Sequence, residues 1–141
     1  METKDVPYIT ESTGNHMAQF YNVNRDPALV AEERGLAIVY PKENQLFIDL
    51  DNDQSRTLLE KNLDITQKLF PDMIVTYTPS ISGGEHFHCV ITLGEGVVLE
   101  EMQRLLLQAC LGSDRTRELL GYARLHLRYN VPITCFFERK D

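Results

Sequence analysis

Two pairs of polar side chains have types and spacing that suit metal and phosphate chemistry. Asp49 and Asp51 are separated by one residue, and so are His86 and His88. Two neighbouring carboxylates repel each other unless a cation neutralises them, and their hard oxygen atoms favour Mg²⁺ or Mn²⁺. Imidazole adds a ligand suited to Mn²⁺ or Zn²⁺, or a donor to a phosphate. The two pairs together predict a divalent-cation site that can clamp a triphosphate or activate a hydroxyl.

Each pair also has a plainer interpretation. Asp51, Asn52 and Asp53 can be turn and helix-capping residues, and alternating histidines are typical of a solvated strand face. The small residues at positions 80–84 allow a backbone to approach a phosphate closely, but they fit a simple hairpin connection equally well. The presence of both pairs on neighbouring predicted strands favours a functional site over these plainer interpretations.

The elements that must position these residues follow from the apolar periodicity and the turn signals. The run 41–44, Pro-Lys-Glu-Asn, predicts a hairpin between the first two strands. Without the first strand and the last helix, the order is β-α-β-β-α-β, as in ferredoxin-like and RNA-recognition-like folds. We expect strands at 36–40, 45–51, 73–78, 86–93 and 132–137, and helices at about 27–34, 53–70, 99–110 and 113–129.

The predicted fold class is therefore α/β in the α+β sense, with an added N-terminal strand and an extra C-terminal helix. Residues 1–30 are expected to be a partly irregular N-terminal arm, and residues 31–141 a single domain. In this topology strands 45–51 and 86–93 are central neighbours, and helices cover one face of the sheet. Since strand side chains alternate between faces, the open face should carry Phe47, Asp49, Asp51, His86 and His88, and the covered face Leu46, Ile48, Leu50, Phe87, Cys89, Ile91 and Leu93.

These motifs resemble those of the archaeo-eukaryotic primase (primase–polymerase) superfamily, which is built on an RNA-recognition-like palm. Its first motif is hydrophobic residues followed by D-x-D/E, as in Leu46-Phe47-Ile48-Asp49-Leu50-Asp51. Its second is a Ser/Gly-rich turn before a histidine, as in Ser82-Gly83-Gly84-Glu85-His86. Its third is an Asp after a hydrophobic stretch, as in Leu111-Gly112-Ser113-Asp114. The resemblance covers about residues 36–137 and implies that residues 31–141 form a primase-like palm.

The resemblance also implies a role for each matched residue. Asp49, Asp51 and Asp114 would hold two divalent ions, Mg²⁺ or Mn²⁺, and with His86 would form the catalytic set. The implied activity is nucleotidyl transfer in phage DNA replication, with a nucleotide or DNA as ligand and a helicase or other replication protein as a further partner. The implied substrate-binding residues are Ser82, Gly83, Gly84, His88, Arg115 and Arg117.

Two other interpretations stay open. His86-Phe87-His88 is also similar to the metal motif of HUH endonucleases, in which a helix-borne tyrosine attacks a DNA phosphate. Tyr122 is the candidate nucleophile, although the usual Tyr-x-x-(x)-Lys pattern is not met. The third interpretation is a non-catalytic phage interaction protein on the same fold, whose acidic N-terminal portion suits a basic protein partner.

Charge is unevenly distributed along the 141 residues, whose net charge is −7. Residues 1–102 hold 7 Lys/Arg against 17 Asp/Glu, which gives −10, whereas residues 103–141 hold 7 against 4, which gives +3. Five of the latter basic residues lie between Arg104 and Arg128. This pattern predicts either a phosphate-binding stripe or a solvated helix face.

The remaining composition predicts a cytoplasmic protein, in the host cytoplasm if it is phage-encoded, with no membrane partner. No apolar run approaches the roughly 20 residues of a membrane span, and the first residues do not resemble a secretion signal. Cys89, Cys110 and Cys135 are odd in number and lack C-x-x-C spacing. We therefore expect reduced, buried thiols.

Overall fold

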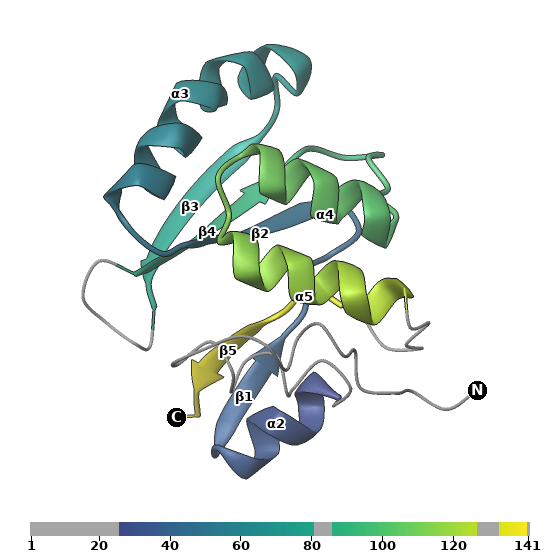
Figure 1. Ribbon diagram of the computed structural model, residues 1–141. Helices are drawn as coiled ribbons and strands as arrows, with labels where there is room; N and C mark the ends of the chain where they lie inside the picture. The colour runs from purple at the N-terminus through teal and green to yellow at the C-terminus, as the bar shows by residue number, and fades with distance from the viewer. Residues whose placement is uncertain (1–25, 81–85, 127–132, 141) are drawn as a thin grey trace.

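The computed structural model describes residues 26–80, 86–126 and 133–140, which form four helices and five strands in two antiparallel sheets (Figure 1). Residues 1–25 of the expected arm therefore lie outside the described residues. In chain order the elements are α2 (Pro27–Glu33), β1 (Leu36–Val39), β2 (Gln45–Leu50), α3 (Asp53–Leu69), β3 (Ile74–Pro79), β4 (Phe87–Thr92), α4 (Glu101–Cys110), α5 (Arg115–His126) and β5 (Phe136–Arg139).

The larger sheet has the strand order β2-β4-β3, with every neighbouring pair antiparallel. The prediction that strands 45–51 and 86–93 are neighbours is thereby confirmed. In the register of β2 and β4, Asp49 lies opposite His88. The D-x-D and H-x-H motifs thus meet on adjacent strands.

One face of this sheet forms the hydrophobic core, as the alternation predicts. Leu46, Ile48 and Leu50 of β2 have no exposed surface, and neither have Cys89 and Ile91 of β4. Burying such side chains contributes roughly 1.5–3 kcal/mol each. Helices α3 and α4 cover this face (Figure 1), and the core cluster includes Leu59 and Leu111.

The predicted hairpin between the first two strands is wrong. Strand β1 instead pairs with β5 in a separate two-stranded sheet, where Ile38 lies opposite Phe137. The fourth strand expected beside β2 is therefore absent from the larger sheet. An isolated two-stranded ribbon is marginal in water, and here α2 packs on β1, with Val30 and Ala31 of the helix buried.

The position of β5 has a physical cause at the free edge of β2. A strand edge carries backbone N–H and C=O groups that need partners, and helices α4 and α5 and the loop between them provide these partners. The bonds are Arg104 Nε to Gln45 O (2.9 Å), Phe47 N to Gln108 Oε1 (2.8 Å), Arg117 Nη1 to Phe47 O, Asp49 N to Ser113 Oγ (3.0 Å) and Asp114 N to Asp49 O (2.7 Å). No bonding group of this stretch is left for another strand.

Two smaller expectations concern a helix end and the thiols. Helix α3 is capped by Asn52, one of the three residues for which the sequence allows a turn or capping role, and its side chain accepts a hydrogen bond from Ser55 N at 2.9 Å. The three cysteines are free as expected, but only Cys89 is buried, since Cys110 at the end of α4 is exposed and Cys135 is partly exposed.

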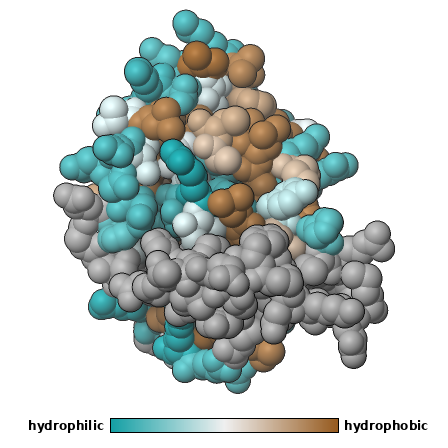
Figure 2. Space-filling view, viewed as in Figure 1, coloured by the Kyte–Doolittle hydropathy of each residue, from teal (hydrophilic) through white to brown (hydrophobic). Residues whose placement is uncertain are grey.

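An apolar patch lies on the outer surface of α4 and α5, bordered by hydrophilic residues (Figure 2). Met102, Leu106, Leu119 and Tyr122 are between 47% and 63% exposed there. Among the described residues, no helix combines the length and apolar character needed to cross a membrane.

Candidate divalent-cation and phosphate site

A pocket of about 530 Å³ opens between the larger sheet, α5 and the β1–β5 ribbon. Its lining includes six of the residues that the sequence singled out, contributed by β2, β4, α5 and the segments beside them. These residues are Asp49, Asp51, His86, His88, Asp114 and Arg117. A volume of this size is typical of a small-molecule site.

Asp114 reaches the pocket because the α4–α5 connection runs alongside β2. Its backbone N–H donates to Asp49 O at 2.7 Å, and the preceding Ser113 Oγ accepts from Asp49 N at 3.0 Å. Gly112 makes this route accessible: its φ is +92°, and a Cβ there would lie 2.8 Å from Ser55 O. Residue 114, separated from residue 49 by most of the domain, is thus placed beside the D-x-D motif.

The carboxylate cluster, defined here as Asp49, Asp51 and Asp114, brings three acidic side chains together in the lining of the pocket. Burial raises the pKa of Asp49, and Asp51 raises it further, while Arg117 and His86 act in the opposite direction. Burial also raises the pKa of Asp114, and the charges of Asp49 and Asp51 add to this effect. Mutual repulsion of this kind favours a bound cation.

The donor set fits a divalent cation by chemistry. Carboxylate oxygens with an adjacent imidazole are the ligands of Mg²⁺ and Mn²⁺ sites, and the cluster has the negative charge that such an ion neutralises. Within the part of the chain that the structure describes, however, no group of three or more His, Cys, Asp or Glu side chains is arranged to hold a metal ion. Binding therefore requires the carboxylates to rotate towards a common point.

The two histidines occupy different environments. His86 Nδ1 lies 2.8 Å from Asp51 Oδ1, and both side chains are about half exposed. His88 stacks face to face on Phe136, with ring centroids 3.7 Å apart and planes 1° apart. Burial, and secondarily Arg117, lowers the pKa of His88 to about 4. His88 is therefore a neutral packing residue at physiological pH, and His86 is the histidine available to a ligand.

The two arginines expected to bind substrate also differ. Arg115 is exposed and lies away from the pocket lining. Arg117 lines the pocket, but its guanidinium donates to Phe47 O, Glu118 Oε2 and Cys135 O. It also lies 5.0 Å from the centre of the Phe136 ring. Its main visible role is to join β2 to the ribbon. Ser82, Gly83 and Gly84 lie outside the described residues.

The sequence left open whether the basic residues between Arg104 and Arg128 form a phosphate-binding stripe or a solvated helix face, and two of those that the structure describes, Arg104 and Arg117, fit neither alternative. Arg104 is only 3% exposed and donates to Gln45 O and Lys42 O. Arg104 and Arg117 therefore donate hydrogen bonds to backbone carbonyl oxygens within the protein. Arg124 lines the pocket, and Arg128 lies outside the described residues.

Sequence reasoning missed several residues that build the site. Gln108 is fully buried, and its Nε2 donates to Glu118 Oε1 at 3.0 Å and to Thr134 Oγ1 at 3.4 Å. A polar residue on the apolar face of α4 was a readable signal for this network. Phe136, which stacks on both His88 and Phe47, had no signal because its place depends on how the ribbon docks.

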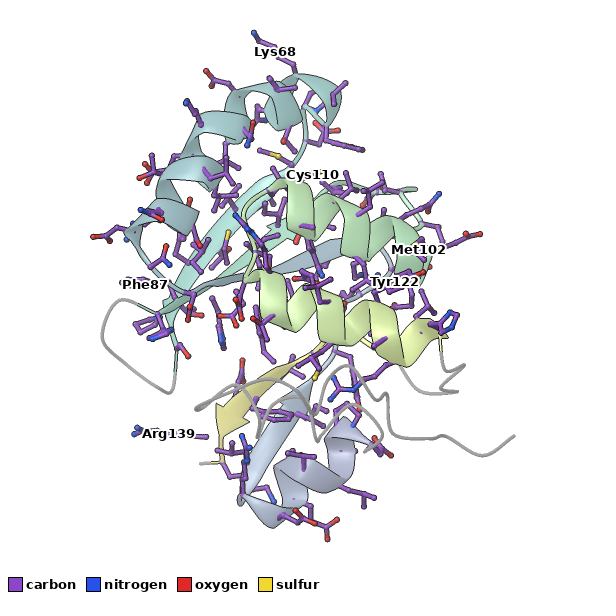
Figure 3. The ribbon with its side chains drawn as sticks, in the orientation of Figure 1. Lys68, Phe87, Met102, Cys110, Tyr122 and Arg139 are labelled. Carbon is purple, nitrogen blue, oxygen red and sulfur yellow. The ribbon has the colours of Figure 1, made fainter. Side chains whose placement is uncertain are left out.

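Tyr122, the nucleophile of the endonuclease alternative, lies on the outer side of α5. It is 51% exposed, and its ring is 6.2 Å from that of His126 (Figure 3). The pocket is lined by the other side of α5, through Arg117, Gly121 and Arg124. A phosphate bound near His86 would therefore lie on the opposite side of α5 from Tyr122, out of reach of its hydroxyl.

Comparison with known proteins identifies no relative of this chain. No protein-family model matches the chain, no curated protein matches it, and no solved structure matches it. The arguments for function therefore come from the residues and their geometry.

Proposed function

We propose that this protein is a primase–polymerase-like domain that binds a divalent cation together with the phosphates of a nucleotide or nucleic acid. The observation that carries the proposal is the meeting of three separate motifs at one pocket. Asp114 N is bonded to Asp49 O, and Asp51 is paired with His86. Side chains matched to three motifs of one superfamily are thus neighbours, although the chain separates them by up to 65 positions.

The fold gives partial support. The order β2-β4-β3 and its antiparallel pairing are those of three of the four strands in a ferredoxin-like palm. The fourth position is filled by side chains of α4 and α5, which leaves β5 to pair with β1. We therefore propose a diverged palm that keeps the strands carrying the motifs.

The roles of the residues follow from their surroundings. Asp49, Asp51 and Asp114 would hold Mg²⁺ or Mn²⁺, which when bound supplies positive charge to a phosphoryl group and an attacking hydroxyl. Asp51 fixes the Nδ1 side of His86, which directs the other ring nitrogen towards a phosphate oxygen. His88 and Phe136 keep water from the buried side of Asp49. The proposed reaction is nucleotidyl transfer, with the carboxylate cluster as its catalytic set.

Calorimetric titration of Mn²⁺, with and without a deoxynucleoside triphosphate, tests the proposal. The wild type should bind Mn²⁺, and bind it more tightly with nucleotide present. The double variant Asp49→Asn/Asp51→Asn should lose both effects, whereas the matched control Asp64→Asn/Asp72→Asn, which alters exposed carboxylates outside the pocket lining, should behave as wild type. Mn²⁺ binding that survives in the first variant would remove the basis of the proposal.

A non-catalytic binding module is the second candidate, and one observation favours it. In the described residues the carboxylates do not converge as metal ligands. Nucleotide binding that is unchanged by Asp49→Asn/Asp51→Asn and by chelation of divalent ions would support this candidate over the enzyme.

A further inference from the structure

The two outer edges of the β2-β4-β3 sheet differ in how their backbone groups are bonded. At the β2 edge, α4, α5 and the loop between them bond to Gln45, Phe47 and Asp49. At the other edge, away from α5 and the ribbon (Figure 1), β3 pairs only with β4. Five of its six residues are exposed, and the large apolar side chain of Ile74 is 63% exposed. β3 is therefore an uncovered edge strand, and such a strand is a template for pairing with another chain.

The register of β3 with β4 shows which of its backbone groups face outwards. Ser80 N donates to His86 O at 3.0 Å, so these two residues form a hydrogen-bonded pair. In an antiparallel ladder such pairs alternate with pairs that are not hydrogen-bonded. Every second residue of β3 therefore bonds to β4, and the others direct their N–H and C=O groups to the open edge. The outward-facing residues are Val75, Tyr77 and Pro79. Among the described residues, none bonds to the N–H groups of Val75 and Tyr77.

The outward groups of β3 are complementary to those of a second β3 in antiparallel orientation. With a two-fold axis at Thr76, Val75 lies opposite Tyr77 of the other copy, and the two residues can exchange both hydrogen bonds. The two-fold axis repeats this pair, which gives four hydrogen bonds. Pro79, which has no N–H, then lies opposite Met73, whose N–H is already bonded within its own chain at 3.0 Å. No N–H group is therefore left without an acceptor where the pairing ends.

The side chains of β3 suit the same pairing. Thr76 would lie opposite its own counterpart and Val75 opposite Tyr77, and Thr–Thr and aromatic–β-branched pairs stabilise antiparallel sheets. The strand, IVTYTP, carries no charge, so that no like charges are brought together. Beside it, Arg56 lies 5.3 Å from the centre of the Tyr77 ring and is paired with Glu60 at 3.5 Å, so these two charges offset each other. The net charge of −7 opposes association only weakly at physiological salt, where the Debye length is about 8 Å.

We propose that β3 is a self-association edge, through which two copies of this chain pair to form one six-stranded sheet of the order β2-β4-β3-β3-β4-β2. Because Asp49 lies opposite His88 and His88 opposite Thr78, the three side chains share one face. Antiparallel pairing keeps that face on the same side in both copies. The two candidate cation sites would therefore open on one face of the sheet, with their β2 strands five strand spacings, about 24 Å, apart.

The interface is small, since it contains four backbone bonds and a few side-chain pairs. We therefore expect a transient dimer with a Kd of about 10 µM to 1 mM. The inference does not depend on the proposed function, because the described lining of the pocket contains no residue of β3.

Sedimentation equilibrium and amide hydrogen exchange of the full chain, both at rising protein concentration, test the proposal. The mass should rise from the 16.2 kDa of one chain towards twice that value. The amides of Val75 and Tyr77 should exchange rapidly in dilute protein and should be protected severalfold as the dimer forms. The amide of Thr76, which bonds to β4, should be protected at every concentration.

Thr76→Lys tests the position of the two-fold axis, because it places two like charges directly opposite each other. Position 76 is exposed, and lysine is common on edge strands, so the variant should fold, as protection of the β4 amides would show. It should raise the Kd of the dimer by roughly tenfold or more. The control Gln54→Lys adds the same charge at an exposed position of α3, about 200° around the helix from Arg56. It should leave the Kd within about twofold.

Two results would overturn the proposal. One is a wild-type chain that stays monomeric at a concentration on the order of 1 mM. The other is a dimer that Thr76→Lys does not weaken, because association would then occur through another register or another surface, such as the apolar patch of α4 and α5. In neither case would the test of Mn²⁺ binding at the pocket be affected.

Discussion

The two faces of the β2-β4-β3 sheet are made by alternate residues of the same strands, yet they differ in polarity and in their contribution to stability. Leu46, Ile48 and Ile91 lie on the helix side without exposed surface. On the other side, burial raises the pKa of Asp49 and lowers that of His88. The helix side stabilises the fold through apolar burial, whereas the other side holds polar groups in surroundings that disfavour their charged forms. Such groups reduce stability, and their presence is typical of functional sites.

The largest effect should come from the helix side. Leu46→Ala removes a fully buried side chain and should lower the free energy of unfolding by about 2–5 kcal/mol, through lost burial and the cavity that remains. The control Thr76→Ala, an exposed residue of β3, should cost less than about 1 kcal/mol. Urea denaturation measures both. Equal losses would contradict the assignment of the helix side as the main source of stability.

Next in size should be the loss of the edge contacts between β2 and the helices. Gln108→Leu leaves the Phe47 N–H without its acceptor and Glu118 Oε1 without the Gln108 donor, while Arg117 still donates to Glu118 Oε2, and unsatisfied buried groups cost about 1–3 kcal/mol. Hydrogen exchange of the Phe47 amide should accelerate along with the drop in stability. The exposed Gln54→Leu should change stability by no more than about 0.5 kcal/mol. Unchanged exchange at Phe47 would show that Gln108 does not hold this edge.

A smaller effect, of opposite sign, is expected on the polar side. Without divalent ions at pH 7, Asp49→Asn should stabilise the protein by roughly 1 kcal/mol, because it removes a buried charge that repels Asp51. A carboxyl whose folded pKa lies above its unfolded value costs stability above both values and none below both. The gain should therefore fade as the pH falls through the raised pKa towards about 4.

Thermal unfolding at several pH values checks this prediction, with the exposed Asp64→Asn as control. Saturating Mn²⁺ should reverse the order, since only the wild type would gain stability from the ion. An Asp49→Asn protein that is less stable than wild type at every pH would mean that the carboxylate is satisfied in the ion-free state.

At pH 7 the smallest effect should come from His88, because its protonation begins to affect stability only at lower pH. Because its folded pKa, about 4, lies below the usual 6.5, the unfolded chain binds the proton first as the pH falls. The stability that neutral His88 contributes is complete above about 6.5 and is lost as the pH falls towards 4. The variant His88→Phe keeps a ring for Phe136 and cannot titrate. Wild-type stability relative to this variant should therefore decrease between pH 7 and pH 4.5.

Melting temperatures of the two proteins across that pH range provide the measurement. His126→Phe, at an exposed position of α5, should run parallel to wild type. A constant difference between wild type and His88→Phe would mean that His88 titrates normally and is not enclosed by Phe136.

The local parts of the fold were readable from the sequence for definite reasons. The alternation in Leu46–Asp51 predicts which side chains enter the core, and the structure confirms it, since Leu46, Ile48 and Leu50 are all fully buried. The adjacency of β2 and β4 followed from element order and the short connections between β3 and β4. The pairing of β1 was wrong because a short loop favours a hairpin only when both strand edges are free. Here α4 and α5 take the edge of β2.

The sequence by itself determined the faces of the strands, the pairing of D-x-D with H-x-H, and the oxygen and imidazole donors that these motifs present, because a strand has a strict two-residue period. Only the tertiary structure decided that Asp114 would lie beside Asp49, that Arg117 would bond to backbone rather than stay open, and that Phe136 would cover His88. These contacts join residues 48 to 70 positions apart. Their formation depends on whether α4 and α5 or another strand bonds to the free backbone groups of β2. The local pattern of residues along the chain does not predict which of these will do so.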